Sequence, residues 1–269
     1  MRLRNKVAIV TGGARGIGAG IARALAADGA RVGIVDLDGN EAGTTASALP
    51  TEGIGVAADV TEETDATRAI DEIAARFGGV DILVNNAGGG RGIEGLGNPF
   101  TRITQQGWDE QLATNLRTTF VASKAAVRHL EARGGGSIVN IASIAGLVPA
   151  VPIPAYGAAK AGVIAFTRTL ALELGPKDIR VNAICPGYVW TRAWELLATM
   201  MKMAMPEYAE LEPRDIFLEQ VKRGVPLGRE QTPDDMGRLA VFLASDDGRN
   251  ITGQAISVDG GITLRVGPS

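Results

Sequence analysis

The feature that most constrains the fold is an alternation of two patterns along the whole chain. Short apolar runs rich in Val and Ile recur, and longer stretches between them repeat apolar residues at helical spacing. Strands that alternate with helices need crossover connections, which make the sheet mostly parallel and cover both of its faces with helices. The predicted strands are residues 7–11, 31–36, 55–60, 81–85, 137–141, 180–184 and 255–259, and the main helical stretches are 17–27, 62–76, 108–131, 157–174 and 233–244.

This rhythm predicts an α/β fold with a doubly wound, mostly parallel sheet of seven strands. It continues to about residue 259, and no Pro/Ser-rich linker, charge block or internal repeat divides the chain, so we expect a single domain over residues 1–269. Ligands of such sheets bind at the carboxyl ends of the strands. The segment of about 188–230 is longer than a usual connection and rich in methionine, which is typical of a functional loop.

Composition disfavours several classes of partner. The formal net charge is −3 and charges of both signs are interspersed, so we expect neither nucleic acid nor a membrane surface as a partner, but a small molecule. Cys185 is the single cysteine, which excludes an internal disulfide framework and a thiolate metal cluster. The apolar run Val7–Val10 is too short for a signal peptide core and no run reaches 18 residues, so we expect a soluble, cytoplasmic protein.

A glycine-rich stretch, "TGGARGIG" at 11–18, follows the first predicted strand and opens the first predicted helix. Without side chains at Gly12, Gly16 and Gly18, the backbone can turn tightly and a pyrophosphate can approach the positive end of the helix. The spacing is G-x3-G-x-G and not G-x-G-x-x-G, and a tight strand-to-helix turn without a ligand is the alternative.

Asp36 and Arg15 point to opposite cofactor preferences. Asp36 ends the second strand, where a carboxylate can accept both ribose hydroxyls of an adenosine and would repel a 2′-phosphate. It also begins the turn-forming stretch 36–40. Arg15 lies inside the glycine turn and could attract a 2′-phosphate. We therefore expect NAD as the cofactor, with NADP as the alternative.

The stretch "NNAGGG" at 85–90 follows the fourth strand. Asparagine and glycine tolerate unusual backbone angles and let the chain pass close to a flat ligand. An asparagine amide can also brace neighbouring strands, so a structural turn and a ligand contact both stay open.

Few side chains are available for proton transfer. His129 is the only histidine and lies in a helical pattern, where we interpret it as a surface or packing residue, so a metal site and a serine-histidine triad are both disfavoured. Tyr156 and Lys160 are four residues apart on a predicted helix, so their side chains share one face and the ammonium would lower the tyrosine pKa. Ser143 follows the fifth strand and could hydrogen-bond the same substrate oxygen; otherwise it is an ordinary loop serine.

Together these residues resemble the short-chain dehydrogenase/reductase family, over about residues 3–262. The resemblance implies a Rossmann-type fold and an NAD(P)-dependent oxidoreductase. It is carried by motifs whose order and spacing are specific in combination. These motifs are "TGGARGIG" (11–18), Asp36, "DV" (59–60), "NNAG" (85–88), "NL" (115–116), "SIVNIAS" (137–143), "YGAAK" (156–160), "PG" (186–187) and "VDGG" (258–261).

The resemblance implies a role for each catalytic position. Tyr156 would be the general acid/base, Lys160 would hold the nicotinamide ribose and lower the tyrosine pKa, and Ser143 would orient and polarise the substrate oxygen. Asn115 would support a water relay toward Lys160. The implied cofactor-binding positions are Gly12, Arg15, Gly16, Ile17, Gly18, Asp36, Leu37, Asp59, Val60, Asn86, Ala87, Gly88, Tyr156, Lys160, Pro186, Gly187, Val189 and Thr191.

The substrate prediction rests on the segment 188–230, which in this family forms the substrate lid. "TRAWE" at 191–195, a helix pair and "VPLGR" at 225–229 resemble members that oxidise diols and polyols, of the acetoin/butanediol and sorbitol types. A reductase of 3-oxoacyl thioesters or steroids is the alternative, and a non-catalytic nucleotide-binding protein is a further one. Trp190 and Trp194 could equally pack in a core or touch substrate. The resemblance also implies a homo-oligomer, a tetramer.

Overall fold

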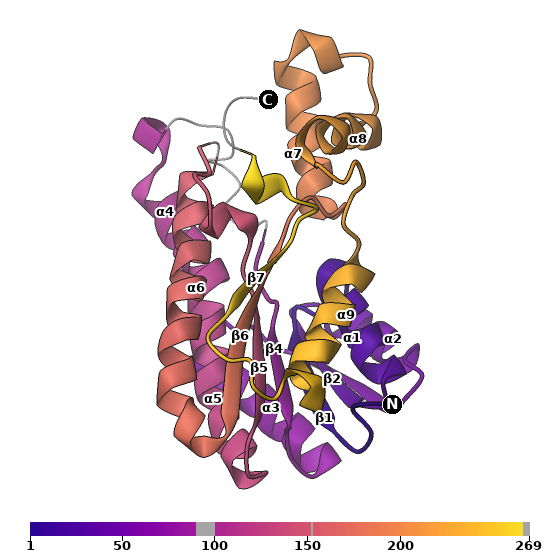
Figure 1. Cartoon of the computed structure of the whole chain (residues 1–269), viewed down its shortest axis with the longest axis vertical. Helices are drawn as coiled ribbons and strands as arrows, with labels where there is room; N and C mark the ends of the chain where they lie inside the picture. Colours follow the sequence, from indigo (N-terminus) through magenta and orange to yellow (C-terminus); the bar gives the residue numbers. More distant parts are fainter. Residues whose placement is uncertain (90–99, 152, 266–269) are drawn as a thin grey trace.

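The computed structural model describes residues 1–89, 100–151 and 153–265, and its centre is one parallel sheet (Figure 1). The strand order is β3-β2-β1-β4-β5-β6-β7 and every strand pair is parallel, as the alternating sequence pattern predicts. The strands are β1 Val7–Thr11, β2 Arg31–Asp36, β3 Gly53–Ala57, β4 Ile82–Asn85, β5 Gly136–Ile141, β6 Ile179–Pro186 and β7 Ala255–Val258. The helices are α1 Gly16–Ala27, α2 Gly39–Ser47, α3 Glu63–Phe77, α4 Gln105–Leu112, α5 Thr118–Ala132, α6 Pro154–Leu174, α7 Arg192–Ala204, α8 Pro213–Gly224 and α9 Pro233–Ala244.

Both faces of the sheet are buried under helices. In β1, Val7 and Ile9 belong to the core under α3, α5 and α6, whereas Ala8 and Val10 belong to the core under α1, α2 and α9. Successive side chains of a strand point to opposite faces, so two hydrophobic cores form on one sheet. This explains why the strands read as continuous apolar runs and not as alternating ones.

Helices α1 and α9 approach each other closely on one of these faces (Figure 1). A Cβ atom on Gly20 would lie 2.4 Å from the Cβ of Pro233, and one on Gly237 would lie 2.6 Å from the Cβ of Ala24. The two glycines therefore permit a helix contact that any side chain would prevent.

The region around β3 differs from the sequence prediction. Strand β3 covers Gly53–Ala57 and not 55–60, and the helix before it, α2, was not among the predicted stretches. Helix α2 buries only Ala42 and Ala46, which is too small an apolar face to give a clear helical pattern. It packs so tightly on β3 that a Cβ on Gly55 would lie 2.3 Å from the backbone nitrogen of Gly43.

The stretch predicted as one helix over 108–131 is interrupted by a π-helical turn at Ala113–Arg117, between α4 and α5. Such turns are rare and occur frequently at functional sites. Asn115 lies in this turn.

Helices α7 and α8 pack against each other beyond the carboxyl ends of the strands (Figure 1). They form the helix pair expected in the segment 188–230, which we call the lid segment. Within the described residues, every helix is too short or too polar to cross a lipid bilayer.

Candidate active site

Three of the predicted catalytic side chains meet where β5 ends and α6 begins. Ser143 follows β5 in extended conformation, and its Oγ accepts a hydrogen bond from the backbone nitrogen of Ala145, at 3.1 Å. The Ser143 hydroxyl lies close enough to the Tyr156 hydroxyl to act on its pKa. Lys160 lies one turn further along α6, with its Nζ 5.7 Å from the centre of the Tyr156 ring. The structure therefore brings the hydroxyl, the phenol and the ammonium into one cluster.

Burial controls the titration of this cluster. The Lys160 side chain is nearly inaccessible, its Nζ donates to the carbonyl of Ile141 at 2.9 Å, and desolvation lowers its pKa to about 8. Desolvation also raises the pKa of Tyr156, against a smaller lowering by the Ser143 hydroxyl. The net shift is opposite to the lowering suggested by the Tyr-Lys spacing, because burial dominates and the ammonium points to Ile141.

Cys185 lies next to this cluster and is fully buried. The backbone nitrogen of Ser143 donates to its thiol, and desolvation raises the thiol pKa to about 11. A neutral, inaccessible thiol is unreactive, so its surroundings agree with a packing role.

Asn115 is held rigidly on the other side of Lys160. Its Nδ2 donates to the carbonyl of Gln111, its Oδ1 accepts from the backbone nitrogen of Gly89 at 2.9 Å, and the side chain is fully buried. A Cβ on Gly88 would lie 2.9 Å from the Asn115 Oδ1 and 3.6 Å from the Lys160 Nζ. The amide and the ammonium thus both face the Cα of Gly88, which leaves no room for a side chain there.

The glycine turn forms a crowded backbone cradle above β1. Gly12 has φ +61°, and a Cβ there would lie 2.8 Å from the Cα of Ala87. A Cβ on Gly18 would lie 2.2 Å from the carbonyl oxygen of Gly12. Asn86 completes the cradle, because its Nδ2 donates to the Gly12 carbonyl at 2.7 Å and to the Thr11 carbonyl at 3.1 Å. Asn86 therefore braces β1 and β4, which is one of the two roles left open by the sequence.

The first turn of α1 is suited to an anion. Gly16, with φ +56°, begins the helix, half-buried Ile17 follows it, and among the described residues no side chain caps this end. Free backbone N–H groups at a helix start, approached over glycine, are the usual binding place of a pyrophosphate. The residues present therefore fit a dinucleotide.

The predicted adenosine end lies beside this cradle. Asp36 Oδ2 accepts from the backbone nitrogen of Ala14 at 3.1 Å, which ties the end of β2 to the glycine turn. Leu37 is exposed, while Val60 is buried. The Asp59 Oδ1 accepts from the backbone nitrogen and the hydroxyl of Thr61, at 2.9 and 2.7 Å, so this carboxylate also shapes the turn after β3.

The predicted nicotinamide end follows β6, whose last residue is Pro186. Gly187 comes next, and a Cβ there would lie 2.5 Å from the Oε1 of Gln231. Gln231 also accepts from the backbone nitrogen of Tyr188 at 2.7 Å and forms a parallel bridge with Val189. Thr191 stands at the start of α7, and its methyl would lie 3.9 Å from a Cβ on Gly16. The loop thus reaches back to the glycine turn.

Sequence reasoning missed Gln231. Its side chain is buried and fixes the loop after β6, but a lone glutamine in a polar stretch carries no signal that could have identified it.

The lid segment has a small core of its own. The rings of Tyr188 and Trp194 have centroids 4.7 Å apart, and Phe217, which is fully buried, lies 5.2 Å from Trp190 and 5.0 Å from Trp194. The guanidinium of Arg214 covers Trp190 and Phe217, each at 5.1 Å. Trp190 and Trp194 therefore pack against the core of the lid segment, and both side chains stay partly exposed. Residues 90–99, which begin with the last glycine of "NNAGGG", lie outside the described residues.

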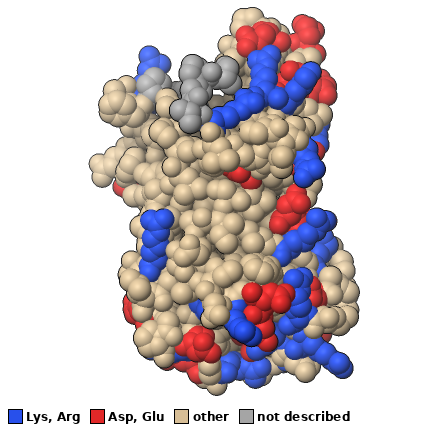
Figure 2. All heavy atoms as spheres, in the orientation of Figure 1, with Lys and Arg blue, Asp and Glu red and all other residues tan. Residues whose placement is uncertain are grey.

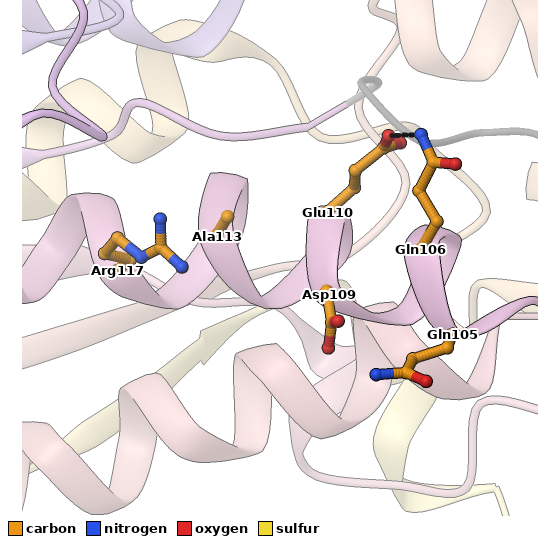
Figure 3. Close-up of a pocket in the computed structure, with 6 residues that line it drawn as sticks. All are labelled: Gln105, Gln106, Asp109, Glu110, Ala113 and Arg117. Atoms are coloured by element: carbon orange, nitrogen blue, oxygen red, sulfur yellow. Dashed lines mark hydrogen bonds between the residues drawn. The ribbon is translucent and has the colours of Figure 1, made fainter.

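A separate hollow of about 540 Å³ lies on the outside of α4 and the π-helical turn. Figure 3 shows that its six lining side chains all come from this one helical stretch, with Gln106 donating to Glu110 at 2.8 Å. It includes none of the predicted site residues, so we do not identify it with the dinucleotide site.

His129 contacts residues outside the catalytic cluster. Its Nε2 is 2.7 Å from a carboxylate oxygen of Asp71 on α3, and the same carboxylate forms an exposed ion pair with Arg128. Within the part of the chain that the structure describes, no three His, Cys, Asp or Glu side chains gather in a way that could hold a metal ion.

Comparison with known proteins agrees with this geometry. A family model described as "Enoyl-(Acyl carrier protein) reductase" matches residues 12–263. Galactitol 2-dehydrogenase of Agrobacterium fabrum is 40% identical, with 97% of this chain and 98% of the relative covered. D-threitol dehydrogenase of Mycolicibacterium smegmatis is 39% identical, with 98% and 95% covered.

The fold is shared with a solved structure as well. The crystal structure of levodione reductase superimposes with a TM-score of 0.88 at 31% identity, covering 98% of this chain and all of the other. The chain therefore belongs to the short-chain dehydrogenase/reductase family and is an oxidoreductase that acts on CH–OH groups.

Proposed function

We propose that the protein is an NAD(H)-dependent dehydrogenase that interconverts a secondary alcohol of a polyol or diol with its ketone. The observation that carries this proposal is the cluster of Ser143, Tyr156 and Lys160 beside a glycine cradle with an acidic residue at its adenosine end. Bound NAD would supply the acceptor for the hydride that leaves the alcohol carbon. The chain supplies position and a route for the proton.

Each member of the cluster has a proposed task in moving that proton. The Tyr156 oxygen takes the proton of the substrate hydroxyl as its own phenolic proton leaves toward Lys160, and Ser143 holds the same substrate oxygen. The neutral amine of Lys160 receives that proton, because a pKa of about 8 lets Lys160 lose its own proton near neutral pH. Asn115 fixes the backbone of Gly89 near the Lys160 Nζ, where a water could continue the route.

The proposed preference for NAD rests on Asp36. Its carboxylate is fixed at the end of β2 by the backbone nitrogens of Ala14 and Asp38, at 3.1 and 3.3 Å. In this place it can accept the hydroxyls of an adenosine ribose and would repel a phosphate.

A polyol substrate is supported by the relatives that act on galactitol and D-threitol. The description of the matching family model instead favours an acyl thioester, which keeps the acyl-carrier-protein class as the second candidate. We propose that the lid segment, about 188–230, covers the substrate within the single domain of 1–269.

The deciding experiment is a substrate panel with the purified protein. Galactitol, threitol, sorbitol, 2,3-butanediol, a hydroxysteroid and a 3-hydroxyacyl thioester are each offered with NAD and with NADP, and reduced cofactor is followed by absorbance. We expect turnover of one or more polyols or diols with NAD. Turnover of the thioester alone would replace the proposed substrate, and NADH binding with no turnover of any compound would favour a non-catalytic protein.

We also propose that the protein acts as a homo-oligomer, a tetramer. Apolar side chains are exposed on helices that cover the sheet, such as Leu172 on α6 and Phe120 on α5. Figure 2 shows a broad central surface with few charged side chains, whereas charges gather toward both ends of the molecule. Light scattering after size exclusion measures the mass directly, and a mass of about 28 kDa, the monomer value, would contradict the proposal.

A further inference from the structure

The single basic side chain of the glycine turn is already engaged by acidic groups. Arg15 is the residue that precedes α1, and its guanidinium lies 3.3 Å from Asp38 Oδ2. It also forms an ion pair with the carboxylate of Glu41. Both carboxylates come from the start of α2, the helix that the sequence did not reveal.

The two carboxylates are held in place relative to the glycine turn. Asp38 caps α2 by accepting from the backbone nitrogen of Glu41 at 3.1 Å, which fixes the first turn of the helix. Thr45, one turn further on, donates its hydroxyl to the carbonyl of Ala14 at 2.7 Å. Helix α2 is therefore fastened to the backbone next to Arg15, and its acidic end cannot swing away without breaking this bond.

The charges around the predicted adenosine ribose do not balance. Arg15 contributes one positive charge, and Asp36, Asp38 and Glu41 contribute three negative ones, which leaves an excess of two negative charges. A phosphate monoester carries about −1.5 to −2 charges at pH 7, so it would meet repulsion and an arginine that is already paired. Ribose hydroxyls carry no charge and would meet neither penalty.

We propose that Glu41, together with Asp38, is a specificity-determining residue that excludes NADP by occupying Arg15. This inference rests on the proposed function and adds residues to it. Asp36 binds the ribose, while the carboxylates at the start of α2 pair with Arg15, the cation of the glycine turn that could otherwise bind a 2′-phosphate. Arg15 then serves to fasten α1 to α2 and not to bind the cofactor phosphate.

The test is the variant Glu41→Gln, which keeps the size of the side chain and removes its charge. Dissociation constants of NAD⁺ and NADP⁺ are measured by calorimetry, so the readout does not depend on turnover. We expect NADP⁺ to bind about two- to fivefold more tightly than to the unmodified protein, since each surface charge interaction has a modest effect. The NAD⁺ constant should stay nearly unchanged, and the NADP⁺ gain should shrink at high salt because screening weakens it.

Two further variants separate the possible causes. In Arg15→Gln/Glu41→Gln the gain should disappear, because no freed guanidinium is left to bind the phosphate. Glu52→Gln is the matched control, since it removes the carboxylate of another exposed Arg-Glu pair, with Arg76 at 2.7 Å, and should leave both constants unchanged.

The outcomes distinguish this inference from the proposed function. If Glu41→Gln binds NAD⁺ normally and its NADP⁺ constant is unchanged, the role of Glu41 is wrong while the proposed function stands. A gain that persists without Arg15 would equally overturn the role given to that arginine. If the unmodified protein binds neither dinucleotide, the proposed function itself fails.

Discussion

The glycine cradle and the lid segment are held together by opposite means. In the cradle the backbone itself is packed, and a Cβ on Gly18 would lie 2.2 Å from the carbonyl oxygen of Gly12. In the lid, side chains do the packing: the rings of Trp190 and Trp194 each pack against Phe217 at a steep angle, beyond the sheet. Other lid side chains are open to solvent, such as Met203, of which 85% is exposed.

This difference explains why the two regions carry different information. Where backbone atoms touch, only glycine fits, so the glycine positions of the cradle cannot be exchanged for other residues. Their spacing therefore points to one class of ligand. A core made of exchangeable side chains can be rebuilt in many ways while the sheet below stays the same. The spacing of the glycines therefore indicates the class of cofactor, whereas the substrate, in the proposed function, would depend on the lid segment.

The largest expected effect is on the chemistry at the boundary of the two regions. Tyr156→Phe should lower kcat by about 10²–10⁴-fold, because it removes the group that moves the proton. NADH binding, measured by fluorescence titration, should be retained. The matched control is Tyr208→Phe, which removes the lid hydroxyl that accepts from Gln220 at 2.8 Å and Arg223 at 3.2 Å. Equal kcat values for Tyr156→Phe and Tyr208→Phe would contradict the catalytic role of Tyr156.

The next effect should be confined to the lid. Phe217→Ala removes a fully buried ring, a change that costs about 3–5 kcal/mol in a packed core. We expect faster hydrogen exchange over 192–224 and a higher KM for the alcohol, with strand protection and NADH affinity retained. Loss of protection in β1 and β4 to the same extent would show that the lid and the sheet are one cooperative unit.

A smaller change should damage the cradle. Gly18→Ala forces a Cβ against the Gly12 carbonyl and the Asn86 amide, and overpacking of this kind costs about 1–3 kcal/mol. Denaturant unfolding should show this loss, and NADH affinity should fall. Gly43→Ala on α2 is the control, because its Cβ would have nothing within 4 Å and alanine favours a helix by about 0.5–1 kcal/mol. Equal free energies of unfolding for Gly18→Ala and Gly43→Ala would show that the cradle tolerates a side chain at Gly18.

The mildest perturbation, because it changes no residue, is a change of pH during turnover. Alcohol oxidation requires the Tyr156-Lys160 pair to have lost a proton, and the Lys160 pKa is about 8 while that of Tyr156 is raised. Below pH 8, kcat/KM for oxidation should therefore rise by about tenfold per pH unit and then level off, while ketone reduction falls as the pH rises. A flat oxidation profile between pH 6 and 9 would contradict this assignment. Cys185→Ala should keep the midpoint, since the thiol pKa of about 11 lies outside this range.

The sequence predicts the sheet well because its strands are buried on both faces. Strands β1 and β2 and helix α9 have the predicted bounds, since their apolar runs have clear ends. Helix α2 and the true start of β3 were missed, because small residues pack there by close backbone approach and leave no periodic pattern. The family assignment followed from motifs and was confirmed by the relatives.

The candidate site was only partly accessible to sequence reasoning. The spacing of Tyr156 and Lys160 and the place of Ser143 after β5 were enough to group these side chains. The direction of the Tyr156 pKa shift could not be predicted from this spacing, because it depends on how much water the folded chain removes from the hydroxyl. The pairing of Arg15 with Glu41 depends on a tertiary contact between α1 and α2 and leaves no mark in the local sequence.

The glycine contact between α1 and α9 also bears on how the protein is synthesised. Ile21 and Leu25 on α1 are fully buried in the core that α9 completes, yet residues 233–244 are synthesised long after α1. A nascent chain therefore carries an uncovered apolar surface on α1 until α9 has been made. A premature stop before α9 would leave that surface permanently bare, so such truncated products should be substrates for chaperones and proteases.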